Sequence, residues 1–115
     1  MPAFLLKSIM ALIEKIAVLS NKLHCQARLK LKHNDLPEAW GSGIGFPVRT
    51  YIEIIGPWPF REVDWVEINP VVMEHIGRLV APKRWNHSEQ LIALIESERV
   101  SYSSVDGMIR ISLDT

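Results

Sequence analysis

The sequence predicts a single α+β domain in which two main helices pack on a mainly antiparallel sheet of about five strands. Three observations support this fold class. An apolar repeat of three and four residues near the N-terminus indicates a helix, period-two alternation from residue 25 onward indicates strands, and an Asp-Gly pair near the C-terminus indicates a hairpin. The expected order is helix, three strands, short helix, helix and hairpin. The 115 residues fit one domain, 1–115, with its own core.

The first helix is predicted from an apolar stripe in residues 3–19. Its members recur at spacings of three and four residues: Leu5, Ile9, Leu12, Ile13, Ile16 and Leu19. Lys7, Glu14 and Lys15 interrupt the run, so it falls short of the roughly 18 apolar residues of a membrane-spanning helix. No small-residue cleavage site of a signal peptide follows. We therefore expect the helix to pack on its own domain; membrane-surface and partner-helix roles are the alternatives.

The first strand is expected directly after this helix. Residues 25–33 alternate apolar with polar side chains, and the polar face carries the cations Arg28, Lys30 and Lys32. This row reads first as a solvated face or a charged strand edge, and second as a patch for nucleic acid or an acidic partner. Residues 34–47 are rich in Gly, Pro, Ser, Asn and Asp, which predicts a long loop.

Residues 48–55 and 62–68 predict the second and third strands, joined around residues 56–61. The connecting segment contains the run Pro-Trp-Pro-Phe, in which the two prolines restrict the backbone. In the third strand the apolar positions change phase beside Trp65. This change predicts either a β-bulge or burial of both faces of the strand, with Trp65 in the core.

Two helices are expected in the C-terminal half. Asn69 can cap a short helix with a proline in its first turn, and Glu74 and Arg78 lie four residues apart on it. A longer helix is predicted to begin near Asn86, because a Glu three residues later completes a capping box. Its apolar face is formed by Leu and Ile side chains.

The C-terminal hairpin has the clearest local signal in the chain. Type I′ turns favour the dipeptide Asp106-Gly107, and extended runs flank it on both sides. A two-residue loop there predicts three cross-strand pairs: Ser104 with Ile109, Tyr102 with Ile111, and Val100 with Leu113. One face of the hairpin is therefore mostly apolar.

Charge is sorted along the chain although the formal net charge is zero. Residues 1–34 contain six Lys or Arg and one Glu, a net charge of +5. Residues 35–75 contain seven acids and two Arg, a net charge of −5, and the remaining residues balance. The pI near 6.9 and the lack of a recognition motif count against a general nucleic-acid binder. The single cysteine, Cys25, cannot form a disulfide framework and favours a reducing, cytoplasmic location.

The sequence carries no motif for catalysis, metal binding or cofactor binding. Residues 41–45 contain G-x-G-x-G, but Pro47 follows, and no helix N-terminus is predicted there to hold a phosphate. The four histidines do not have the spacing of zinc ligands. We therefore expect no enzymatic activity, cofactor or metal; an acid/base pair or a hard-cation site on the acidic strands is the alternative.

Acidic and aromatic side chains gather between residues 40 and 67. Aromatic residues anchor interfaces when they fill a pocket of the partner, and acidic residues steer a basic partner into place. The predicted partner-binding residues are Trp40, Glu53, Trp58, Phe60, Glu62, Asp64 and Glu67. In the other interpretation the acids are a solvated face and the loop tryptophans close over the core.

Two short strings carry a resemblance: VDWVEI at residues 63–68 and DGMIRI at residues 106–111. They resemble elements of small bacterial cytosolic proteins whose function is not established. In size, α+β layout and acidic aromatic surface the chain also resembles immunity proteins of bacterial toxin systems. This resemblance implies a cytoplasmic protein that binds a cognate toxin and covers its active site. Such a toxin would offer Lys and Arg groups that normally hold phosphate or nucleic acid.

Two other functions stay open at the level of sequence. A nucleic-acid-binding module would use Arg28, Lys30 and Lys32, and a small ligand-binding or enzymatic domain would use the acidic strands. We expect no membrane partner. The apolar content of 48% leaves a homodimer as a further option.

Overall fold

The computed structural model describes the backbone of residues 3–48 and 51–113 and the side chains of residues 9–45 and 51–113. This part of the chain forms two α-helices and nine strands. In chain order these are α1 (Ala3–Lys22), β1 (Ala27–Leu31), β2 (Gly45–Val48), β3 (Tyr51–Glu53), β4 (Pro57–Pro59), a 3-10 turn (Phe60–Glu62), β5 (Val63–Ile68), β6 (Val71–Glu74), β7 (Lys83–Asn86), α2 (Ser88–Ser97), β8 (Tyr102–Val105) and β9 (Met108–Ser112). The predicted α+β class with mainly antiparallel strands is confirmed.

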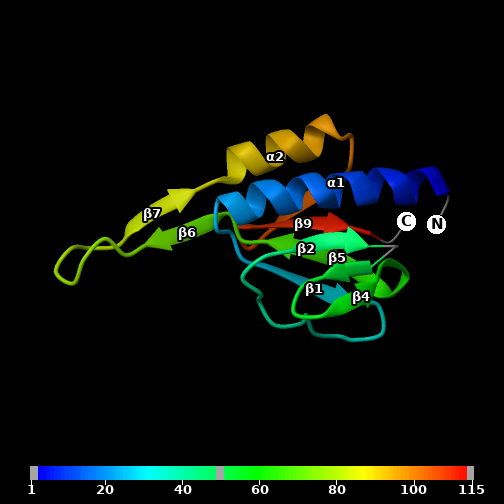
Figure 1. Ribbon diagram of the computed structural model, residues 1–115, viewed down its shortest axis with the longest axis horizontal. Helices are drawn as coiled ribbons and strands as arrows, with labels where there is room; N and C mark the ends of the chain where they lie inside the picture. Colours follow the sequence, from blue (N-terminus) through cyan, green and yellow to red (C-terminus); the bar gives the residue numbers. More distant parts are fainter. Residues whose placement is uncertain (1–2, 49–50, 114–115) are drawn as a thin grey trace.

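The strands form three sheets instead of the one expected from the sequence. The largest has four strands in the order β1-β5-β9-β8, a second has three in the order β2-β3-β4, and β6 and β7 pair by themselves. The strand pairs described in these sheets are antiparallel. Both helices lie on one side of the four-stranded sheet, and the β6–β7 pair projects from the end of the molecule (Figure 1).

The apolar stripe of α1 supplies much of the core, as predicted. Leu12, Ile13 and Ile16 are fully buried, and Ile9 is 3% exposed. The helix packs against α2 and β2. Among the described residues, no helix is long and apolar enough to cross a membrane.

Strand β5 is the central element of the four-stranded sheet, because β1 and β9 pair with it on either side. The sequence predicted a bulge near Trp65 or burial of both faces, and the strand has both features. Trp65 lies opposite Lys30 but Val63 lies opposite Leu31, so Asp64 is the extra residue. Residues 65–68 are all buried.

The single strand predicted for residues 48–55 is wrong. Val48 is the last residue of β2 and residues 51–53 form β3, with Val48 opposite Tyr51. Ile54 and Ile55 lie beyond β3, and Arg49 and Thr50 lie outside the described residues. The predicted loop of residues 34–47 correspondingly gives its last three residues to β2. Gly45 permits this close approach, because a Cβ at that position would lie 2.8 Å from Cβ of Glu53.

The short helix predicted from Asn69 is also wrong, because β6 takes its place. The carboxamide Oδ1 of Asn69 accepts a hydrogen bond from the Val71 N–H at 3.0 Å, which makes an Asx turn instead of a helix cap. Two β-branched valines follow and favour extended backbone. Glu74 does not lie on a helix with Arg78; it accepts a hydrogen bond from Trp85 Nε1 at 2.8 Å across the strand pair.

The second helix and the C-terminal hairpin agree with the sequence. The helix begins near Asn86 as predicted, and Asn86 Oδ1 accepts a hydrogen bond from the Ser88 N–H at 2.9 Å. The predicted capping box is wrong, because the N-cap is His87, whose side chain makes no cap hydrogen bond. Asp106 and Gly107 have φ angles of 51° and 80°, as a type I′ turn requires. The register places Tyr102 opposite Ile111 and Ser104 opposite Ile109, as predicted, whereas the predicted pair of Val100 with Leu113 lies beyond the paired strands.

The thiol of Cys25 is fully buried, and burial raises its pKa to about 11. Because the folded thiol holds its proton above the unfolded pKa of 9.0, this residue contributes stability that is lost as the pH rises from about 9 to about 11. We expect Cys25→Ala to cost about 1–2 kcal/mol at pH 7 and to remove this part of the alkaline destabilisation. Urea unfolding of both proteins between neutral and alkaline pH measures the difference. An unchanged alkaline slope in the variant would contradict the assignment.

Candidate functional site

A buried carboxylate holds two arginines on the face of the four-stranded sheet that the helices leave uncovered. Glu67 is 1% exposed, and its Oε1 accepts from Arg28 Nε at 2.8 Å while its Oε2 accepts from Arg110 Nε at 2.9 Å. The three residues lie side by side on β1, β5 and β9. The predicted role of Glu67 as a partner-facing acid is therefore wrong, because its charge is neutralised inside the protein.

Two tryptophans extend this cluster through cation–π contacts. The Arg28 guanidinium carbon lies 4.5 Å from the Trp40 ring centroid, and the Arg110 guanidinium carbon lies 4.1 Å from that of Trp65. Trp40, predicted as an interface anchor, is thus half-buried against Arg28 and closes the long loop over the sheet. Trp65 is 7% exposed, in agreement with its predicted place in the core.

Arg28 and Lys30 of the basic strand form ion pairs with carboxylates of the same molecule. Arg28 binds Glu67, and Lys30 Nζ lies 3.1 Å from Asp64 Oδ2. These two cations therefore do not form a row of free charges that could track a phosphate backbone. The nucleic-acid interpretation of Arg28, Lys30 and Lys32 has no support from this geometry.

The Pro-Trp-Pro-Phe segment turns its aromatic rings inward. Trp58 lies opposite the buried Ile52 in the β3–β4 pair, and its Nε1 donates to the Ile54 carbonyl oxygen at 3.3 Å. Phe60 is 2% exposed and belongs to the hydrophobic core. The expectation that Phe60 fills a depression on a partner is therefore wrong, and Trp58 offers a partner only part of its ring.

The opposite face of the same strand pair points to solvent. Tyr51 lies opposite Pro59 and Glu53 opposite Pro57, and in an antiparallel pair such partners share a face. Tyr51 is 44% exposed, and Glu53 is exposed as well. We call the four residues Tyr51, Glu53, Pro57 and Pro59 the acidic hairpin face. Glu53 was predicted from the sequence as a partner-binding residue, whereas Tyr51 was not. The alternation of Tyr51 with the inward Ile52 could have indicated that Tyr51 points outward.

The remaining predicted acids do not form one cluster. Glu62 ends the 3-10 turn and is half-buried, and Asp64 pairs with Lys30 on the sheet. Because Glu67 is held between two arginines, the four acids Glu53, Glu62, Asp64 and Glu67 are distributed among separate surroundings. Within the described residues, no three His, Cys, Asp or Glu side chains come together to hold a metal.

A small hollow lies between the long loop that precedes β2 and the β3–β4 strand pair with its connecting turn. Its volume is about 180 Å³, and its lining is mainly apolar with one carboxylate: Glu38, Ala39, Ile54, Ile55 and Trp58. Ile55 is 64% exposed, so the apolar lining reaches the surface. We call this hollow the acidic pocket.

The β6–β7 pair and its connecting loop, residues 71–86, form an arm that stands out from the body (Figure 1). The molecule measures 52 × 29 × 25 Å, and the arm lies at one end of the long axis. Its large apolar side chains are unusually open to solvent: Met73 49%, Ile76 60%, Leu79 100%, Val80 59% and Trp85 40% exposed. Patches of this kind on a protein surface mark interaction sites.

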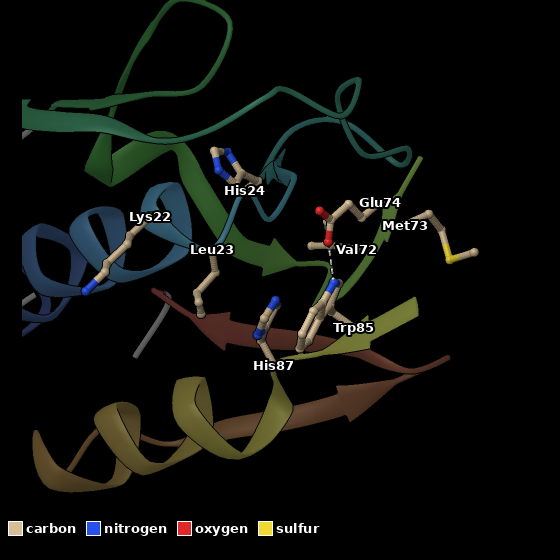
Figure 2. A pocket seen from close by; sticks show the side chains of 8 residues that line it. All are labelled: Lys22, Leu23, His24, Val72, Met73, Glu74, Trp85 and His87. Atoms are coloured by element: carbon tan, nitrogen blue, oxygen red, sulfur yellow. Dashed lines mark hydrogen bonds between the residues drawn. The ribbon is translucent and has the colours of Figure 1, made fainter. Parts of the chain in front are cut away.

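A shallow pocket of about 520 Å³ lies where the arm meets the end of α1 (Figure 2). Leu23, Val72 and Met73 provide apolar walls, and the rings of Trp85 and His87 are nearly parallel, with centroids 6.3 Å apart. Its polar lining consists of the Lys22 ammonium group, the imidazole rings of His24 and His87, and the Glu74 carboxylate, which accepts a hydrogen bond from Trp85. We call it the arm-base pocket.

Comparison with known proteins gives one family and no individual relative. No curated protein matches the chain, and no solved structure matches it. One family model matches residues 19–112, which include only the last four residues of α1 but all of the strands and the second helix that follow. The chain therefore belongs to the family of unknown function DUF6678.

Proposed function

We propose that the protein is a non-enzymatic binding protein of the immunity type, which neutralises a bacterial toxin domain by covering its active site. The observation that carries this proposal is the exposed Tyr51, which shares the acidic hairpin face with the exposed Glu53. A tyrosine with a neighbouring carboxylate can fill a depression and meet a cation at its edge. This pairing suits a catalytic site whose Lys or Arg groups hold phosphate or nucleic acid.

Two physical features favour such a role for this face. Pro57 and Pro59 are the two end residues of β4 and pair with Glu53 and Tyr51, so little backbone freedom is left to lose when a partner binds. Tyrosine also has few side-chain torsions and combines a large apolar ring with a hydroxyl group, which makes it a frequent interface anchor. The immunity role extends the resemblance found in the sequence, and binding to a protein partner is the part that the exposed face supports directly.

The proposal is tested with the product of the open reading frame adjacent to this gene. We expect that product to be toxic in cells, to be neutralised by co-expression of this protein, and to form a complex with it in solution. Tyr51→Ala should weaken the complex about 30-fold or more, which is about 2 kcal/mol. Biolayer interferometry of the purified pair measures this change.

Charge reversal separates recognition by this face from general charge effects. Glu53→Lys should slow association and make it less dependent on salt, because electrostatic steering is lost. Glu14→Lys, an exposed position on α1, is the matched control and should bind normally. A non-toxic neighbouring product, or a complex that tolerates both Tyr51→Ala and Glu53→Lys, contradicts the proposed function.

A further inference from the structure

We propose that the arm of one copy docks into the acidic pocket of a second copy, and that two such contacts close a homodimer. The inference goes beyond the proposed function, because it assigns a partner to the arm, which the acidic hairpin face does not use. It rests on the exposure of the arm, on charge, on the size of the pocket and on the positions of the two surfaces in the molecule.

The arm tip carries apolar side chains that a free monomer leaves in water. Leu79 is 100% exposed, and Ile76 and Val80 are 60% and 59% exposed. Burial of a leucine side chain against apolar atoms is favourable, because it removes apolar surface from water. Association with a surface that covers these three side chains is therefore favourable through apolar burial alone.

The arm has a net positive charge, which favours an acidic surface as its binding partner. Residues 71–86 contain Arg78, Lys83 and Arg84 against Glu74, a net charge of +2, and all four residues are exposed. The chain as a whole is neutral, so the rest of the molecule has a net charge of −2. The part of a second copy that lies outside its own arm therefore has a net charge opposite in sign to that of the arm.

The acidic pocket fits one side chain of the arm tip. It has apolar walls, a carboxylate from Glu38, and a volume of about 180 Å³. For scale, the cavity that an engineered leucine removal leaves in a protein core is roughly 150 Å³. Leu79 therefore matches the pocket in size and polarity, and Arg78 or Arg84 matches Glu38 in charge.

The other hollow near the arm is a poorer receptor for a basic arm. The arm-base pocket has Lys22, His24 and His87 in its lining, and its one acid, Glu74, is bonded to Trp85. A second arm in that pocket would bring its cations close to Lys22 of the receiving molecule. Like charges at such a contact oppose association.

The positions of the arm and the acidic pocket allow two copies to form a closed dimer. The arm lies at one end of the 52 Å axis, and β4, the strand that contains Trp58, lies outside the arm in the body of the molecule (Figure 1). Two copies packed side by side in opposite directions place each arm at the acidic pocket of the other. Such a twofold arrangement makes the contact twice and leaves no arm exposed, whereas a head-to-tail arrangement would grow into a filament.

The first experiment measures mass in solution. Light scattering after gel filtration should show a dimer, twice the 13.1 kDa of the chain, for the wild-type protein. Leu79→Asp, Arg84→Glu and Glu38→Arg should each raise the dimer dissociation constant about tenfold or more. Arg99→Glu, an exposed cation after α2, is the matched control and should leave the dimer unchanged. Circular dichroism melts check that each variant is folded.

The second experiment exchanges the charged residues of the arm and the acidic pocket. Mixing the Arg84→Glu and Glu38→Arg proteins should restore a dimer, because each of its two contacts again pairs opposite charges. The Arg84→Glu/Glu38→Arg double variant should dimerise by itself for the same reason. These outcomes do not depend on the toxin, so a failed neutralisation assay and a failed dimer remain distinguishable.

Three results would overturn the inference. The first is a wild-type protein that stays monomeric at high micromolar concentration. The second is a dimer that tolerates Leu79→Asp and Glu38→Arg. The third is a monomer whose Arg84→Glu variant loses binding to duplex DNA or to vesicles of phosphatidylcholine and phosphatidylserine, which would assign the arm to one of those ligands.

Discussion

Replacing Glu67 with Gln is expected to lower the free energy of unfolding by about 3 kcal/mol. The carboxylate is 1% exposed and bonds to guanidinium groups of both Arg28 and Arg110. Removal of one partner from a buried ion pair typically costs about 3–5 kcal/mol, because the remaining charge has lost its compensation. The lower end applies here, since the arginine side chains are 27% and 29% exposed and can regain some hydration.

The matched control is Asp64→Asn on the same strand. Asp64 also pairs with a cation, Lys30, but its side chain is 33% exposed, so the expected loss is below about 1 kcal/mol. Urea unfolding at neutral pH measures both variants. Equal effects would mean that burial does not determine the strength of these pairs, and the structural role assigned to Glu67 would be wrong.

The position of Glu67 in the fold also explains why the separation of basic and acidic residues along the sequence was misinterpreted. The sequence has a basic N-terminal block and an acidic middle block, and acids of the middle block were predicted to face a partner. In the fold, β1 from the basic block pairs with β5 from the acidic block, so Arg28 meets Glu67 and Lys30 meets Asp64. Strand pairing between residues nearly forty positions apart leaves no local signal. Part of the charge separation is therefore cancelled within the sheet before it reaches the surface.

Elements with strong local signals were predictable from the sequence. The apolar period of α1, the Asn86 signal for α2 and the Asp106-Gly107 turn each depend on neighbouring residues, and each agrees with the structure. Residues 69–78 failed because the same features, an Asn followed by Pro, serve either a helix cap or a turn before a strand. The pairing of β6 with β7 favours the turn over the helix cap, and this pairing depends on tertiary structure.

The candidate site was predictable only in part. Glu53 is exposed as expected, but the inward direction of Trp58 depends on its register with Ile52, which a sequence does not contain. That register leaves Tyr51, rather than Trp58 or Phe60, as the aromatic side chain presented outward. The arm was missed for a related reason. Nothing in the local sequence around Ile76, Leu79 and Val80 indicates that these apolar side chains are exposed, as they are in the structure.

The second large effect is expected from removal of residues 1–20. The truncated protein should lose its cooperative unfolding transition, because α1 contributes Leu12, Ile13 and Ile16 to the core with no exposed surface. The sheet and α2 cannot cover the apolar area that this helix buries, and a domain of this size has little stability to spare. Thermal melts followed by circular dichroism, together with the dispersion of amide signals in NMR spectra, measure the loss.

A pair of point variants shows whether the lost stability comes from packing of this one face. Ile16→Ala removes a fully buried side chain and should cost about 2–5 kcal/mol, whereas Val18→Ala, at a position 53% exposed on the same helix, should change stability by about 0.5 kcal/mol or less. If the truncated protein instead melts cooperatively at the wild-type temperature, α1 is an appendage. In that case the four-stranded sheet must be covered by a second copy or by another protein, and Ile16→Ala would weaken that association instead of the fold.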